Sequence, residues 1–196
     1  MKSTTMLRPF NFGLTLFAAL LFAATSCKDK PADTEEVAEE QNDEKFDDNS
    51  MENDAEFLVA AAEMDLMEIQ LGKLAQRSAN ADVKAHGKMM EDEHTKSSNE
   101  LKTLAASKNI SIPAALTEDG MDKYNKLSDK QAEDFDDAYL DMMIDNHEKA
   151  INKFERNVDR TEDAEIKSWA TKTLGTLRMH LEHTRALEEK LDNARK

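Results

Sequence analysis

The stretch DVKAHGKMMEDEHTKSSNEL, residues 82–101, decides the fold of this 196-residue chain. Residues on one side of it recur every three or four positions, which is the period of an α-helix with a single buried face. That face consists of Val83, His86, Met90, His94, Ser97, Leu101 and Ala105. His86 and His94 stand where a stable helix would normally carry Leu or Ile. The stretch therefore predicts a helix that buries two imidazole rings.

Helical periodicity of the same kind continues on both sides of this stretch. It predicts a first helix over 53–78, a third over 128–158 and a fourth over 161–191, with 109–127 as a connection. Residues branched at Cβ are few and never alternate with polar ones, so no strand is expected. The chain is predicted to be all-α, with an up-down-up-down four-helix bundle over 55–196.

Capping signals mark the starts of all four helices, and Asn53 with Glu56 has the spacing of a capping box that opens the first. Asn80 or Asp82 would cap the second helix, because short polar side chains accept hydrogen bonds from the free N–H groups of a first turn. Ser128 with Gln131 has the spacing of a capping box for the third helix. Thr161, followed by acidic residues that the helix dipole favours, would open the fourth.

Four of the five histidines lie on the apolar faces of the predicted helices: His86, His94, His147 and His180. A buried imidazole needs a polar partner or a metal, since an unpaired buried polar group is costly. At about 1.5 Å per helical residue, Glu68, His94 and His147 lie at one depth, and His180 lies roughly 9 Å deeper. The candidate metal site is therefore Glu68, His94 and His147, with His180 as a fourth ligand.

This set of side chains has two interpretations. Imidazoles with one carboxylate suit a divalent transition metal, with Fe, Zn or Cu as the candidates. Alternatively each histidine is satisfied by a protein neighbour such as Asp136, Tyr139 or Thr173, because buried polar networks also specify packing without a ligand. His183 lies on the flank of its helix and is expected to be solvated.

Enzyme activity is the less favoured hypothesis, and no catalytic residue is assigned. A ferritin-like di-iron oxidase normally uses a Glu from each of two helices and Glu-x-x-His from the other two. This chain has that motif once, at Glu91 and His94, whereas Ile144 stands three residues before His147. A metal oxidase therefore remains only an alternative.

The N-terminal 27 residues have the layout of a secretory signal peptide. Lys2 and Arg8 precede an apolar run over 12–24, and Cys27, the only cysteine, follows it. Ala24-Thr25-Ser26-Cys27 resembles a bacterial lipobox, so Cys27 is the expected lipidation site. The alternatives are ordinary cleavage nearby or an uncleaved anchor, although the run is short for a membrane span of about 20 residues.

Residues 28–54 contain twelve acidic residues against three lysines. Because this segment is highly charged and has few apolar side chains, it is expected to be a disordered tether between the lipid and the bundle. Lys28 is not the Asp that retains lipoproteins in the inner membrane of well-studied Gram-negative bacteria. An outer-membrane lipoprotein facing the periplasm or the cell surface is therefore expected, with the membrane as its partner through the lipid.

Residues 55–196 carry 21 basic and 29 acidic side chains, so the domain is acidic as well. A negative surface without a basic patch offers nothing to release counterions from a polyanion. Nucleic acid is therefore excluded as a partner, and no protein partner is indicated.

Several motifs resemble those of the bacterial ferritin-like proteins of unknown function that are often labelled putative outer membrane proteins (domain of unknown function 4142). They are Met67–Ala75, Glu93-His94-Thr95-Lys96, Phe135–Tyr139, His147–Ala150 and Thr173–Leu177 leading to His180-Leu181. The resemblance covers about residues 55–190 and implies a ferritin-like fold in the cell envelope. The family's activity is poorly defined, so the resemblance implies no mechanism.

The sequence thus predicts an envelope lipoprotein whose helical bundle binds a metal ion through buried His and Glu side chains. The first alternative is a non-catalytic structural or interaction module whose histidines serve only packing. It predicts that apolar residues of similar volume can replace the inner histidines without loss.

Overall fold

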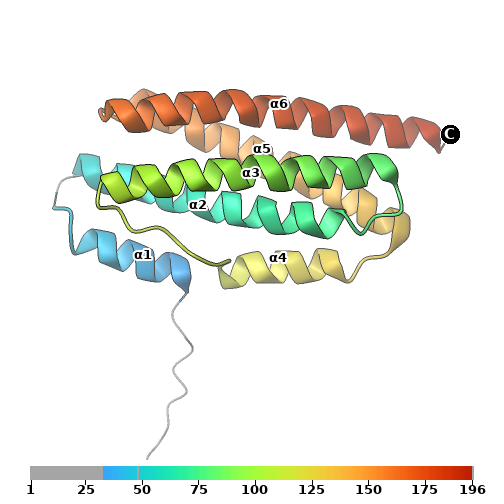
Figure 1. Cartoon of the computed structure of the whole chain (residues 1–196), viewed down its shortest axis with the longest axis horizontal. Helices are drawn as coiled ribbons and strands as arrows, with labels where there is room; N and C mark the ends of the chain where they lie inside the picture. The colour runs from blue at the N-terminus through green and yellow to red at the C-terminus, as the bar shows by residue number, and fades with distance from the viewer. Residues whose placement is uncertain (1–32, 48, 196) are drawn as a thin grey trace, which may run out of the picture. The chain divides into compact units, whose positions relative to one another are not determined.

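The computed structural model describes residues 33–47 and 49–195. The expected signal peptide over 1–27, with Cys27, lies outside these residues. The described part forms six helices and no strand, which confirms the all-α prediction (Figure 1). None of the described helices combines the length and the apolar character that a membrane crossing needs.

Four long helices form a bundle, in which α2 packs mainly on α3 and α5 packs mainly on α6 (Figure 1). Two short helices, α1 and α4, lie against α2. The helices are α1 (Thr34–Asp43), α2 (Asn49–Ala75), α3 (Ala81–Ser107), α4 (Glu118–Ser128), α5 (Ala132–Arg160) and α6 (Ala164–Ala194).

A polar layer divides the apolar core into two clusters. Each long helix contributes to both clusters, and along each helix the change from one to the other comes at a polar residue: Asp65, His94, His147 or His180. The first cluster includes Phe57, Phe154 and Trp169, and the second includes Leu71, Met90 and Tyr139. The polar layer is thus enclosed by apolar packing on both sides along the bundle axis.

Helices α2 and α3 approach each other closely at two glycines. A Cβ atom added at Gly72 would lie 2.7 Å from the carbonyl oxygen of Gly87 and 2.8 Å from the backbone nitrogen of Glu91. One added at Gly87 would lie 2.6 Å from the Cβ of Ala75. Only glycine fits at either position. The two glycines therefore allow the α2 and α3 backbones to approach closely two turns from the polar layer.

Part of the segment expected to be a disordered tether is helical, which corrects the predicted boundary at residue 55. Helix α1 lies within that segment, and α2 begins at Asn49, so that Asn53 is already inside it. The reason is that α1 gains its contacts from distant parts of the chain. Ala38 and Asn42, four residues apart, share one face of α1 and are both buried.

Asn42 fastens α1 to the loop that follows α3. Its side-chain Nδ2 donates to the carbonyl oxygen of Ser111 at 2.9 Å, and its Oδ1 accepts from the Ser111 N–H at 2.7 Å. Asp33, the N-cap of α1, also accepts from the backbone N–H of Glu118 at 2.7 Å. These contacts join α1 to the beginning of α4.

Replacing Asn42 with alanine should lower the free energy of unfolding by about 1 to 3 kcal/mol, because it leaves two backbone groups of Ser111 unpaired. Urea denaturation followed by circular dichroism measures this. Glu40→Ala, at an exposed position of the same helix, is the control and should change little. Equal stability of Asn42→Ala and the unchanged protein would show that α1 does not hold the domain together.

The connection predicted over 109–127 contains a helix as well. Thr117 caps α4, and Ser128 ends it, so Ser128 does not open the third long helix as its capping-box spacing predicted. Helix α5 begins at Ala132 instead, and the side chain of its N-cap Gln131 makes no capping hydrogen bond.

Candidate metal centre

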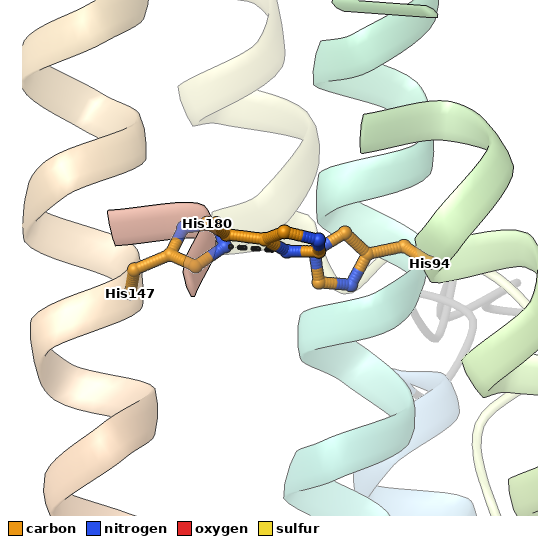
Figure 2. A group of neighbouring side chains, drawn as sticks. All are labelled: His94, His147 and His180. Atoms are coloured by element: carbon orange, nitrogen blue, oxygen red, sulfur yellow. Dashed lines mark hydrogen bonds between the residues drawn. The ribbon is translucent and has the colours of Figure 1, made fainter. Parts of the chain in front are cut away.

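Three histidines from three helices meet in the middle of the bundle (Figure 2). His94 comes from α3, His147 from α5 and His180 from α6, and one ring nitrogen of each lies within 4.8 Å of the others. The centroids of the rings are 5.3 to 5.6 Å apart. All three residues are at most 2% exposed. Such a group of imidazole nitrogens is the donor set that transition metals prefer.

His180 lies in the same layer as the other two, which corrects the predicted offset of roughly 9 Å. The error arose at the turn between α5 and α6. The predicted helix began at Thr161, but α6 begins only at Ala164, and these three residues account for about half of the offset at about 1.5 Å per residue. Residues of a turn run across the bundle and add little depth, so His180 lies closer to the turn than its sequence position implied.

The hydrogen bond of His147 fixes its tautomer. Its Nδ1 lies 2.8 Å from the carbonyl oxygen of Met143, one helical turn earlier. A carbonyl oxygen only accepts, so Nδ1 carries the proton and Nε2 presents a lone pair to the cluster. Nε2 of His147 lies 3.4 Å from Nδ1 of His180, the contact drawn as a dashed line in Figure 2.

Asp65 orients His94 and is the site residue that sequence reasoning missed. Its Oδ1 lies 2.8 Å from Nδ1 of His94, and its side chain is fully buried. A carboxylate that holds one nitrogen of a histidine while the other faces a metal is the usual second layer of a metal site. A signal was present, because Asp65 follows Ala61 by four residues and precedes Glu68 by three, on the same helix face.

Glu68 is buried as predicted but does not belong to the group of three histidines. Its Oε1 accepts a hydrogen bond of 2.9 Å from Nδ2 of Asn146 on α5, and its Oε2 has no partner. Of the four predicted ligands, the structure therefore brings together His94, His147 and His180 and leaves Glu68 beside them.

Burial governs the charges of this layer. It lowers the pKa of His94 to about 4 and the pKa of His147 and His180 to about 3. It raises the pKa of Asp65 and of Glu68 to about 8. Both directions follow from the cost of a charge in a low-dielectric interior. At neutral pH the imidazoles are therefore uncharged, so each has one ring nitrogen with a lone pair, which is the state that binds metals.

His86 fits the packing interpretation instead. Its Nδ1 lies 2.9 Å from the Tyr139 hydroxyl, and its Nε2 lies 3.0 Å from the Thr184 hydroxyl. Both ring nitrogens thus have protein partners, and none is left for a ligand. His183, the remaining histidine, is exposed, as its place on the helix flank predicted.

Glu91, the carboxylate of the Glu-x-x-His motif, does not join the histidines either. Its Oε2 accepts a hydrogen bond of 2.7 Å from the side-chain amide of Gln76, in the turn directly after α2. Among the described residues, the candidate ligand group contains imidazoles and no carboxylate. The arrangement therefore does not supply the bridging carboxylates of a di-iron oxidase.

A protein-family model matches residues 37–187 of the chain, and its description is a domain of unknown function, DUF4142. The match begins within α1, which agrees with the docking of this helix on the bundle. No curated protein matches the sequence.

Among solved structures, the chain resembles the crystal structure of a DUF305 fragment from Deinococcus radiodurans. The TM-score is 0.63 at 12% sequence identity, over 70% of this chain and 96% of that chain. At this identity the likeness concerns the fold alone. The ferritin-like class and the outer-membrane location stay predictions.

Proposed function

This chain belongs to the family of domains of unknown function DUF4142, and we propose that it binds a divalent transition metal through His94, His147 and His180. The observation that carries this proposal is the convergence of three buried imidazoles whose ring nitrogens lie within 4.8 Å of one another.

Hydrogen bonding supports metal binding over packing at this cluster. Of the buried side-chain atoms without a hydrogen-bond partner, two are the Nε2 atoms of His94 and His180. Unpaired buried polar atoms are costly, so a ligand is expected here. A bound dication would also favour the ionised form of Asp65, whose pKa burial raises to about 8.

The donor atoms limit which metal ions suit the site. Three neutral imidazoles suit Fe, Zn or Cu, whereas Mg²⁺ and Ca²⁺ prefer oxygen ligands. None of the three ligands is a thiolate. The carboxylate of Asp65 acts through His94, where it fixes the ring and raises its basicity.

Added Zn²⁺ or Cu²⁺ should raise the melting temperature of metal-free protein, because a ligand that binds only the folded form stabilises it. The gain is about 2.7 kcal/mol when the metal is at 100 times its dissociation constant. His94→Leu and His147→Leu should each abolish the response. Differential scanning calorimetry with and without metal measures this, and isothermal titration gives the stoichiometry.

His183→Leu is the matched control, since this exposed histidine lies on α6 beyond the cluster and should leave the metal response intact. The packing interpretation makes the opposite prediction. The packing interpretation is correct if the unchanged protein binds no metal at micromolar concentration and both leucine variants are at least as stable as the unchanged protein.

We further propose that the domain is held at the cell envelope by a lipid on Cys27, with the outer membrane as the site. The support is the sequence alone, namely the lipobox-like Ala24-Thr25-Ser26-Cys27 after an apolar run. The membrane is then the partner through the lipid, and the acidic domain faces the aqueous side.

Cys27→Ala should release the protein from the membrane fraction, because this residue is the only thiol in the chain that can be acylated. Fractionation of cells that produce either form measures the change. Mass spectrometry of the mature N-terminus is the independent check. A membrane-bound Cys27→Ala protein, together with an unmodified natural N-terminus, would remove the lipoprotein proposal.

A further inference from the structure

A small pocket between α3 and α6 reaches the histidine layer. Its volume is about 40 Å³, and His94 and His180 both line it. Ser97, Thr173 and Thr176, which each carry a hydroxyl group, line it too. An ion pair between Lys172 of α6 and Glu100 of α3, with an N–O distance of 2.8 Å, lies at the same pocket.

Unpaired polar atoms gather at this pocket. Two of its lining residues have a buried side-chain atom without a hydrogen-bond partner: Nε2 of His94 and Nε2 of His180. Buried polar atoms are nearly always paired with protein or ordered water. Their presence at one pocket indicates that something polar occupies the space beside the two imidazoles.

The described residues offer no fourth side chain to complete the coordination of a metal. The Oδ1 of Asp65 is engaged by Nδ1 of His94. Glu68 lines a different groove, between α2 and α5, and is bonded there to Asn146. Metal sites with three protein ligands characteristically keep a further position for water or substrate.

We infer that a metal held by the three histidines keeps an open coordination position toward the α3/α6 pocket, where a small anion of a few atoms binds it. This inference rests on the proposed metal site. It assigns the pocket as the place where exogenous ligands reach the metal, and it assigns the ligand class by size and charge.

Size and chemistry support this assignment. A water molecule needs roughly 10 to 15 Å³ of such space, so the pocket accommodates a few waters or one small anion and excludes larger molecules. Hydroxyl groups can donate hydrogen bonds to an anion. Binding is a ligand exchange in which the anion takes the place of a metal-bound water, with no change in oxidation state.

The test uses Co²⁺ as the metal and azide as the anion, with the full-length protein. Co²⁺ bound to the three imidazoles should give visible absorption bands, and azide should shift these bands in a saturable way. Thr176→Phe fills the pocket from α6 without removing a ligand. It should keep Co²⁺ binding and weaken azide binding at least tenfold.

Ala60→Phe is the matched control, because Ala60 lines the α2/α5 groove and should leave both Co²⁺ and azide binding unchanged. If Thr176→Phe fails to fold or loses Co²⁺, Ser97→Leu fills the same pocket from α3 and takes its place.

The outcomes separate the two proposals. Absence of Co²⁺ bands in the unchanged protein overturns the metal site itself. Co²⁺ bands that azide does not alter leave the metal site standing and overturn the open position. An azide response that survives both pocket-filling variants shows that the anion arrives from another side, and it overturns the assignment of the pocket.

Discussion

Metal-free protein should be most stable between about pH 6 and about pH 6.5 and should lose stability on acidification from there to about pH 4.5. Four buried histidines, His86, His94, His147 and His180, have pKa values lowered to between about 3 and about 4. In this window each binds a proton only in the unfolded state. Asp65 and Glu68, with pKa values raised to about 8, and Glu35, with a pKa raised to about 7, bind protons only in the folded state and offset part of this loss.

Above pH 6.5 the dependence of stability on pH has the opposite sign. The histidines are then neutral in both states, whereas the three carboxyls still hold protons in the folded state alone. Stability therefore falls as the pH rises from 6.5 to about 8. Urea denaturation at fixed pH values, with a chelator present, gives the free energy of unfolding across the range.

Two variants should change this profile in different ways. His86→Leu removes one histidine that lies outside the metal cluster, so stability should fall less steeply on acidification and should keep its slope above pH 6.5. Glu68→Gln removes one carboxyl, so stability should fall less steeply above pH 6.5 and more steeply on acidification. Stability that rises steadily from pH 5 to pH 8 would contradict the protonated state assigned to the three carboxyls.

Gly72→Ala should destabilise the protein by about 1 to 3 kcal/mol, the usual cost of overpacking a fitted interior. The added methyl group would meet backbone atoms of Gly87 and Glu91 at 2.7 and 2.8 Å. Backbone atoms cannot rotate away as a side chain can, so α2 and α3 would have to separate. Thermal and urea denaturation both measure the loss.

Gly175→Ala is the same substitution at a helical position where nothing lies within 4 Å of the new methyl group. It should stabilise the protein by about 1 kcal/mol, because alanine favours the helix over glycine by that amount. Opposite signs for the two variants are the expected pattern. If Gly72→Ala were as stable as the unchanged protein, the close approach of α2 and α3 would not contribute to the stability of the fold.

The long helices could be predicted from the sequence because their signals are local. Asn80 caps α3 as expected, with its Oδ1 accepting from the backbone N–H of Asp82 at 2.9 Å and of Val83 at 3.4 Å. Helices α1 and α4 could not be predicted, because they are held by distant contacts. The acidic composition around α1 indicated disorder, and only the pairing of Asn42 with Ser111, 69 residues away, shows why it folds.

The three ligands were predictable from helix periodicity, since each histidine lies on an apolar face. Their meeting in one layer was not fully predictable, because the depth of His180 depends on where the turn before α6 ends. Asp65 was missed for a different reason. A carboxylate next to an apolar face is usually solvated, and only its distance to His94 shows that it is buried and bonded.

The division of the core by the polar layer bears on how the domain opens. Each end of the bundle has its own apolar cluster on the same four helices, and the layer between them contributes unpaired polar atoms instead of apolar contact. Such an arrangement favours two cooperative units that exchange amide hydrogens at different rates. A metal that joins α3, α5 and α6 at their boundary would couple these units, so that occupancy determines whether the bundle unfolds in one step or two.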